Sequence, residues 1–359
     1  MRKIVCFSFL TVMLAVCSCS NKPEYIVTPV KETSFVDQDR PLLEPEKIDS
    51  SPLGLFNLMS YDKYLFFITQ DYNAYLKIYD VETGSQVAAI CHQGRASNEF
   101  NFPLFFTSEQ AYTVNGEIML PLMDASGSMT EINITKSIDQ QRAVVNRTAS
   151  AGIRNTNSHV AFVDDNFSRL FVSDLLLSSS EPARPVQFYV READGGKTEI
   201  PVFKDVMSGE DNFGICNYYS GVLMKHPSKN IMVYSMTFLN YLFFMDLDNN
   251  KTYAIHQKNS ETFDKYVTEN PNTLHFSDAT VSEDYYFTFY FYNCKTNQPD
   301  SDIECELLAF DWEGNYAGGF KSQTPLHRVT YNKKTDSLIF ANLSDETLYS
   351  IPVKDILKK

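Results

Sequence analysis

The sequence predicts an all-β protein, a six-bladed β-propeller whose blades each have four antiparallel strands. Phe and Tyr occur 27 and 21 times, and such aromatic enrichment is typical of strands. No long segment has the 3.6-residue apolar period of a helix. Strand-and-turn units recur six times at a spacing of roughly 55–65 residues, near the upper end of known propeller repeats.

The first unit is the clearest. Two apolar segments, 64–69 and 74–80, are followed by a turn at 81–84 and a third strand-like segment at 85–90. An Asp…Gly turn between alternating strands is a hairpin signal. This unit therefore predicts consecutive antiparallel strands.

The same pattern follows in order along the chain. It recurs at 117–120 and 130–134 with a turn at 135–137, at 169–172 and 186–190 with a turn at 194–196, at 231–234 and 241–246 with a turn at 249–250, at 286–292 and 307–311 with a turn at 313–315, and at 337–340 and 347–352. Each unit is too small to bury its own faces, so radial packing of sheets is expected. A pair of β-sandwiches with coincidental spacing is the alternative.

The last unit predicts how the ring closes. After residue 353 too little chain remains for a turn and an outer strand. The strand-like segment at 33–43 has no partner of its own. We therefore expect this N-terminal segment to be the outer strand of the last blade, which would otherwise expose an unpaired edge.

The N-terminus is typical of a bacterial lipoprotein signal. Arg2 and Lys3 precede a short apolar run that is too short to span a bilayer, and Ser18 precedes Cys19. Cys17 is a poorer lipid site because bulky Val16 precedes it; a plain secreted protein is the other alternative. We predict a signal peptide at 1–18, a lipidated Cys19 with a tether over 19–32, and the propeller at 33–359, anchored by acyl chains such as palmitate in the cell envelope.

The charge excludes several partners. The net charge is −14, and it becomes −16 without Arg2 and Lys3. Nucleic acids and anionic lipid head groups require basic patches, so neither is an expected partner. The acidic surface itself is typical of a soluble domain.

A short motif follows the first unit. Gly94, Arg95, Glu99 and Phe100 resemble a signature of TolB-like six-bladed propeller lipoproteins of Bacteroides-type bacteria, although residues 96–97 depart from its Gly-Pro pair. The resemblance implies the propeller fold but no transferable activity. From the residues themselves we expect a structural role, in which Gly94 supplies a special backbone angle, Glu99 accepts loop hydrogen bonds and Phe100 packs between blades.

Catalytic signals are sparse. The sequence has neither a phosphate-binding Gly-rich loop nor a Gly-x-Ser-x-Gly motif, and its six histidines lack metal-ligand spacing. Asp80, Asp246 and Asp311 are interpreted as turn formers. No cofactor, metal site or catalytic residue is therefore predicted. Some six-bladed propellers are calcium-dependent lactonases, and their ligands are too far apart in sequence to identify here.

The remaining cysteines and one serine give further hypotheses. Cys91 and Cys216 are interpreted as buried apolar residues. Cys294 and Cys305 flank one loop and would form a disulfide only if the two strands bring them face to face. Asp336-Ser337-Leu338 resembles an O-glycosylation acceptor at Ser337; an ordinary hairpin turn is the alternative.

Together these features predict a lipid-anchored envelope propeller that acts as a binding or scaffolding module. Its expected ligand is a protein or a glycan, bound at a propeller face or at the axial opening. A hydrolase or lactonase with a metal on the axis is the alternative. Three or four carboxylate and amide side chains converging on the axis would favour the enzyme.

Overall fold

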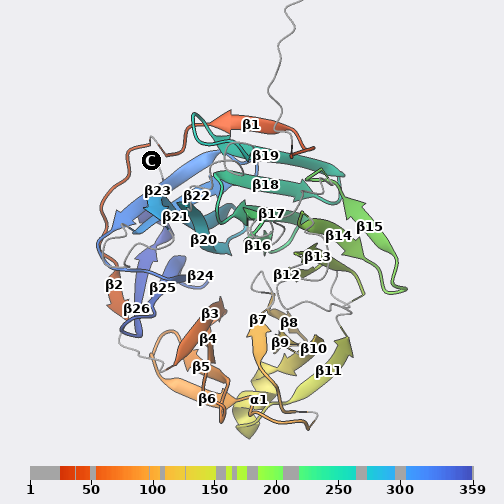
Figure 1. Ribbon diagram of the computed structural model, residues 1–359. Coiled ribbons are helices and arrows are strands. Elements are labelled where there is room, and N and C mark those ends of the chain that lie inside the picture. Colours follow the sequence, from red (N-terminus) through yellow and green to blue (C-terminus); the bar gives the residue numbers. More distant parts are fainter. Residues whose placement is uncertain are drawn as a thin grey trace, which may run out of the picture.

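The computed structural model describes residues 25–36, 38–48, 54–96, 98–105, 110–125, 127–150, 159–163, 168–175, 185–204, 218–263, 273–295 and 305–357. Six mainly antiparallel sheets surround a central axis, as Figure 1 shows. The protein is therefore a six-bladed β-propeller, as the sequence predicts.

Blades 1, 3 and 5 each contain four antiparallel strands in chain order. Blade 1 comprises β3 (Leu55–Tyr61), β4 (Tyr64–Thr69), β5 (Leu76–Asp80) and β6 (Gln86–Ile90). Blade 3 comprises β12 (His159–Phe162), β13 (Leu170–Asp174), β14 (Gln187–Arg191) and β15 (Lys197–Ile200). Blade 5 comprises β20 (Thr273–Val281), β21 (Tyr285–Lys295), β22 (Cys305–Asp311) and β23 (Tyr316–Ser322).

Blade 2 departs from this plan at its inner edge. It comprises β7 (Pro103–Phe105), β8 (Tyr112–Val114), β9 (Glu117–Asp124), β10 (Ser128–Asn133) and β11 (Val145–Ser150). Both β7 and β8 pair with β9, so they share the inner position. The turn expected at 135–137 is instead part of helix α1 (Ile134–Gln140), because the Asn133 side chain accepts the Lys136 N–H at the N-cap.

Blades 4 and 6 both include strands from the N-terminal region. Blade 4 comprises β16 (Gly221–Lys225), β17 (Ile231–Met236), β18 (Tyr241–Asp246), β19 (Lys251–Gln257) and β1 (Val30–Thr33), which runs parallel to β19. Blade 6 comprises β24 (Arg328–Asn332), β25 (Ser337–Asn342), β26 (Thr347–Pro352) and β2 (Glu46–Ile48), followed by helix α4 (Val353–Ile356).

As expected, the ring is closed by an N-terminal strand, but a different segment provides it. An N-terminal strand does form the outer edge of blade 6, where Glu46, Lys47 and Ile48 pair antiparallel with β26. The expected segment, 33–43, was wrong. Phe35 within it is fully buried among residues of blades 4 and 5, and this apolar anchor places the segment there rather than at blade 6.

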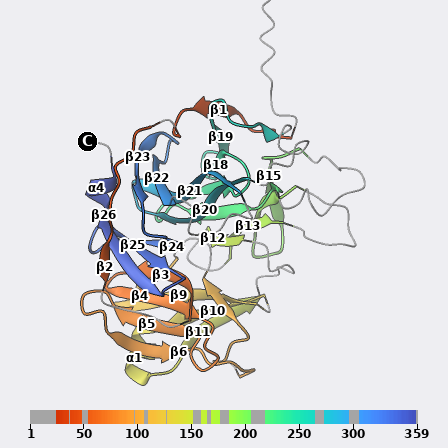
Figure 2. The same cartoon turned by 60° about the vertical axis from the view of Figure 1, so that its left-hand side comes forward.

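Residues 25–36 and 38–48 form an N-terminal belt along the outer edges of four blades. Ile26 bridges Phe203 beside blade 3, β1 pairs with blade 4, Leu42 bridges Lys321 of blade 5, and β2 completes blade 6. The belt is the red segment that follows the rim in Figures 1 and 2. The tether predicted to extend to residue 32 is therefore too long, because the chain already hydrogen-bonds to the propeller at Tyr25.

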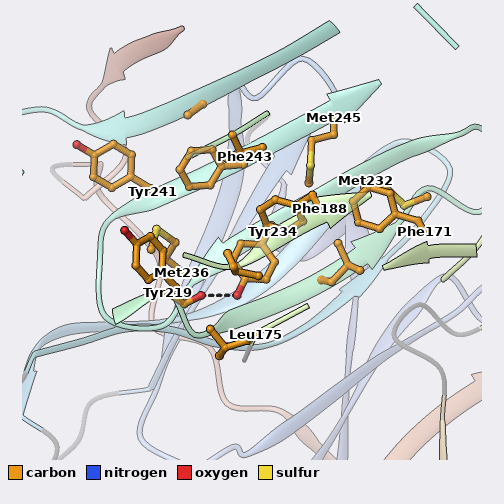
Figure 3. Packing of buried hydrophobic residues seen from close by; sticks show 14 of the residues in the cluster. Phe171, Leu175, Phe188, Tyr219, Met232, Tyr234, Met236, Tyr241, Phe243 and Met245 are labelled. Carbon is orange, nitrogen blue, oxygen red and sulfur yellow. Dashed lines mark hydrogen bonds between the residues drawn. The ribbon is translucent and has the colours of Figure 1, made fainter. Parts of the chain in front are cut away.

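Apolar packing among the described residues forms six clusters, one at each junction between neighbouring blades. Figure 3 shows the junction of blades 3 and 4, where Phe171 and Phe188 meet Met232 and Tyr234. The Tyr234 hydroxyl donates to the Tyr219 carbonyl at 2.5 Å, so this buried polar group is satisfied. The core thus lies between the blades, and it leaves the axis to more polar residues.

Candidate functional site

A cavity of about 670 Å³ opens at one end of the propeller axis. All six blades contribute to its lining, as shown by one residue from each in blade order: Tyr61, Tyr112, Phe162, His226, Glu283 and Tyr331. We call this cavity the axial mouth. Its volume lies within the range of ligand pockets, roughly 300–1,000 Å³.

The direction of the inner strands brings these residues together. Strands β3, β12, β16, β20 and β24 lie innermost in Figure 1, and each reaches the mouth with its last residues. In blade 2 the short strand β8 has this position. The axial mouth therefore lies on the face that carries the turns between the first and second strands of the blades.

Many polar groups near the axis join neighbouring blades. The Thr330 hydroxyl accepts the Ser60 N–H at 2.9 Å, and the Thr280 hydroxyl accepts the Tyr331 N–H at 2.8 Å. Asp278 Oδ2 accepts the Val329 N–H at 2.8 Å. These side chains occupy the strand edges that face the next blade, so their role is structural.

Blade 2 joins blade 3 by the same principle. Gln110 Oε1 accepts the Phe162 N–H at 2.7 Å, and Gln110 Nε2 donates to the Phe162 carbonyl at 3.0 Å. The amide side chain of Gln110 thus pairs with the backbone of blade 3 in the way that a neighbouring strand would.

Three tyrosines of the mouth have their hydroxyl groups fixed by protein partners. The Tyr61 hydroxyl lies 3.0 Å from Thr113 Oγ1, and the Tyr331 hydroxyl donates to Asp336 at 3.0 Å. The Tyr112 hydroxyl accepts from Arg147 at 3.0 Å and donates to buried Glu131. Burial, followed by the bond to Glu131, raises the pKa of Tyr112 to about 12, so it stays neutral.

Charges of both signs surround the opening. Lys333, which is largely exposed, lies 3.9 Å from Glu283, and Lys334 lies 2.6 Å from Glu82. The bond to Glu82 raises the pKa of Lys334. Lys225 is nearly buried and donates to the His226 carbonyl at 3.0 Å. Lysines are therefore concentrated here although the whole chain is acidic.

His226 is a fully buried residue of the mouth. Its Nδ1 accepts the backbone N–H groups of Ser228 and Lys229, each at 3.1 Å, so the neutral ring carries its proton on Nε2. Burial, with the charges of Lys229 and Lys225, lowers its pKa to about 4. Its ring centroid lies 4.4 Å from that of Trp312, the only tryptophan in the chain.

The motif at 94–100 lies away from the mouth and organises its own loop. Glu99 Oε2 accepts the N–H groups of Arg95 and Ala96 at 2.7 and 2.8 Å. Phe100 is buried in the cluster between blades 1 and 2. The special backbone angle expected at Gly94 is wrong, because its φ is not positive. The reason for glycine is space, since a Cβ there would lie 1.9 Å from Glu99 Oε2.

The three aspartates interpreted as turn formers all accept turn N–H groups. Asp80 accepts from Glu82 and Thr83, Asp246 accepts from Asn249, and Asp311 accepts from Glu313 and Asn315. Ser337 begins β25 directly after a turn and donates to the Thr335 carbonyl at 3.1 Å. Its glycosylation stays a prediction.

The disulfide between Cys294 and Cys305 is not formed. Cys294 pairs with Leu274 on β20, whereas the pairing of β21 with β22 ends at Tyr290 and Glu306. The two cysteines are therefore not opposite each other. Burial raises the pKa of the Cys305 thiol, and also that of Cys91, which is buried as expected. Cys19 and Cys216 lie outside the described residues.

Among the residues that the structure describes, no group of three or more His, Cys, Asp or Glu side chains is arranged to hold a metal ion. Neither described helix has the length and apolar character needed to cross a bilayer. The residues of the axial mouth were not identified from the sequence. These residues lie at or just after the ends of the inner strands, and the inner strands themselves were not recognised.

No family model and no curated protein match the sequence. Among solved structures, a member of the DUF4221 family from Bacteroides vulgatus has a TM-score of 0.52 and 13% identity, over 92% of this chain and 98% of that one. A candidate exported protein from Bacteroides fragilis has a TM-score of 0.49 and 11% identity, over 92% and 99%. A luciferin-regenerating enzyme has a TM-score of 0.47 and 10% identity, over 88% and 96%. At 13% identity the likeness to the Bacteroides vulgatus protein shows the fold alone.

Proposed function

We propose that this protein is a binding or scaffolding module of the cell envelope, and that a protein or glycan ligand enters the axial mouth. The observation that carries this proposal is the mouth itself, a concave site to which all six blades contribute. Its lining combines aromatic rings with a few charged groups, which is the usual composition of a ligand pocket.

The donor set at the mouth favours binding over metal-dependent hydrolysis. Among the residues that the structure describes, two carboxylates line it, Asp62 and Glu283. Glu283 accepts from Ser228 at 2.7 Å and lies close to Lys333, so it already has polar partners. Asp278, a further described carboxylate on an inner strand, accepts a backbone N–H of the next blade. Among the described residues, these carboxylates are not grouped around a site that could hold one metal ion.

The experiment compares two matched variants. Thr113→Arg places a long side chain at the rim of the mouth, while Thr198→Arg makes the same change on β15, away from the mouth. Both threonines are exposed, so both variants should fold. We expect the wild type and Thr198→Arg to retain the same protein or glycan from envelope extracts, and Thr113→Arg to lose this ligand. Equal retention by all three proteins would place the binding surface elsewhere.

A metal assay tests the alternative function directly. Elemental analysis of the purified protein is expected to find no metal at unit stoichiometry, and lactone hydrolysis should not respond to added calcium. A stoichiometric metal whose removal abolishes hydrolysis would replace the binding proposal with the enzymatic one.

We also propose that the protein is held in the envelope by lipid on Cys19. The support is the charged and apolar order of residues 1–18 with Ser18 before the cysteine. Cys19→Ala is expected to release the protein from membranes and to abolish palmitate labelling, while Cys17→Ala should leave both intact. Full palmitate labelling of Cys19→Ala would show that another residue carries the lipid.

A further inference from the structure

The axial mouth combines aromatic rings with charged groups. Tyr331, Tyr61 and Tyr112 come from blades 6, 1 and 2, which are consecutive around the ring, so three tyrosines lie on one side. Charged residues occur both there, in blades 6 and 1, and on the opposite side, where blades 4 and 5 contribute Lys225 and Glu283. A ligand in the mouth therefore meets aromatic surface on one side and charged hydrogen-bonding groups on both.

The aromatic side is organised before any guest arrives. Each of the three hydroxyls is already bonded to protein, through Thr113, Arg147 or Asp336. Fixed rings lose little conformational freedom when a ligand binds, and this preorganisation favours affinity. What these tyrosines offer to a guest is mainly their ring surface, which attracts weakly positive C–H groups.

We propose that the axial mouth binds a short oligosaccharide, an inference that rests on the binding function proposed above. A sugar ring has a C–H face that packs on an aromatic ring and a rim of hydroxyls that both donate and accept hydrogen bonds. The mouth offers donors such as Lys333 and acceptors such as Asp62. A strongly anionic guest would meet the carboxylates, and a cationic guest would meet the lysines.

The backbone around the mouth favours a saccharide over a peptide. An extended peptide binds most simply by adding a strand to an unpaired sheet edge. The described inner-strand edges near the mouth are instead occupied by the neighbouring blade, as when Thr330 accepts the Ser60 N–H and Thr280 accepts the Tyr331 N–H. A peptide would find few backbone partners there, whereas a sugar needs only side chains.

The test uses the purified full chain and a library of defined oligosaccharides with neutral, uronic-acid and sulfated members. Bound members are then titrated while the emission of Trp312 is followed, because this single tryptophan contacts His226 of the mouth. Tyr61→Leu and Tyr331→Leu remove one ring each and should weaken binding at least tenfold. The affinity of Tyr61→Phe, which keeps the ring, should lie between the affinities of Tyr61→Leu and the wild type. Tyr72→Leu, an exposed tyrosine outside the mouth, is the control and should bind as the wild type.

Saturable binding that both leucine variants weaken would support the inference. Binding that is equal in the wild type and in both leucine variants would overturn it, because the sugar would then lie elsewhere. If no oligosaccharide binds, the saccharide inference also falls. The binding function itself would still stand if Thr113→Arg loses a protein that the wild type and Thr198→Arg retain.

Discussion

At Gly94, the absence of a Cβ makes room for the carboxylate of Glu99. The motif was recognised in the sequence, and its structural interpretation included hydrogen bonds accepted by Glu99. The reason for the glycine could not be predicted, because a local pattern does not show which atom will occupy the space. Only the folded loop brings Glu99 Oε2 to that position.

This geometry predicts strong coupling between the two residues. Glu99→Ala removes the acceptor for the Arg95 and Ala96 N–H groups, and Gly94→Ala displaces the same carboxylate. Each change should lower the free energy of unfolding by about 1 kcal/mol. Because both remove one interaction, the double variant should cost little more than either single one. Additive losses in urea denaturation would contradict the shared mechanism.

His226 predicts a pH dependence of stability. Its pKa is about 4 in the folded protein, below the ordinary value of 6.5, so the unfolded state binds a proton first as the pH falls. The folded state is therefore destabilised between pH 6.5 and 4, by up to about 3 kcal/mol from this group. Burial likewise lowers the pKa of His159 to about 4 and of His275 to about 3, so both add to the slope with the same sign.

His226→Asn isolates this contribution. The Asn side-chain carbonyl replaces Nδ1 as acceptor for the Ser228 and Lys229 N–H groups, but it does not titrate. Unfolding free energies measured from pH 7 to 4.5 should fall less steeply in this variant, by up to about 1.4 kcal/mol per pH unit. An unchanged slope would mean that the pKa of His226 is the same in the folded and unfolded states.

At the scale of elements, the sequence identified the second and third strands of every blade, and a fourth strand only in blade 1. These strands pack on both faces and carry long apolar runs, such as residues 241–245 of β18. The inner strands were missed because they carry polar groups that bond to the next blade, such as Thr330 and Asn332 in β24. Since the inner strands also form the axial mouth, the site was missed with them.

The belt is fixed to blade 5 by one buried arginine. Arg40 donates to the carbonyls of Phe35 and Val36 and to Glu306, which also pairs with Lys321. Arg40→Met leaves the buried Glu306 carboxylate with its half-exposed partner alone, so it should destabilise the fold by about 3 kcal/mol.

Two further variants separate charge from packing at this site. Lys321→Met should cost less than Arg40→Met, about 1 kcal/mol or below, because Lys321 is more exposed. Adding Glu306→Gln to Arg40→Met should recover part of the loss, since no unpaired carboxylate then stays buried. No recovery in chemical denaturation would assign the effect to lost packing of the arginine side chain.

For the whole molecule, six agreeing units were enough to predict the number of blades, whereas the path of the N-terminal region was not predictable. Segments 33–43 and 46–48 are both short and could each pair with an open edge. The choice depends on Phe35, whose burial against blades 4 and 5 fixes the register of the whole belt. Such a long-range contact has no local signal in the sequence.

Removal of the belt should weaken the entire ring. A chain that begins at residue 46 keeps β2 but loses β1, Phe35 and Arg40, and it should lose more than about 3 kcal/mol, since Phe35 burial alone contributes about half of that or more. A chain that begins at residue 54 also loses β2 and should not form a closed ring. If the chain from residue 46 melts at the wild-type temperature, the part of the belt before β2 does not contribute to stability.

The belt also sets the order in which the molecule can fold. Glu46 pairs with Ser350, so the closing strand and its partner are about 300 residues apart, and contacts of such separation form late. During synthesis the belt is therefore made before the blades, and it cannot form its contacts until blades 3 to 6 have been synthesised. Before β26 has been synthesised, the ring is open and a strand edge is exposed. The ring therefore cannot close until the C-terminal blade is complete, and truncated chains are expected to be degraded by proteases.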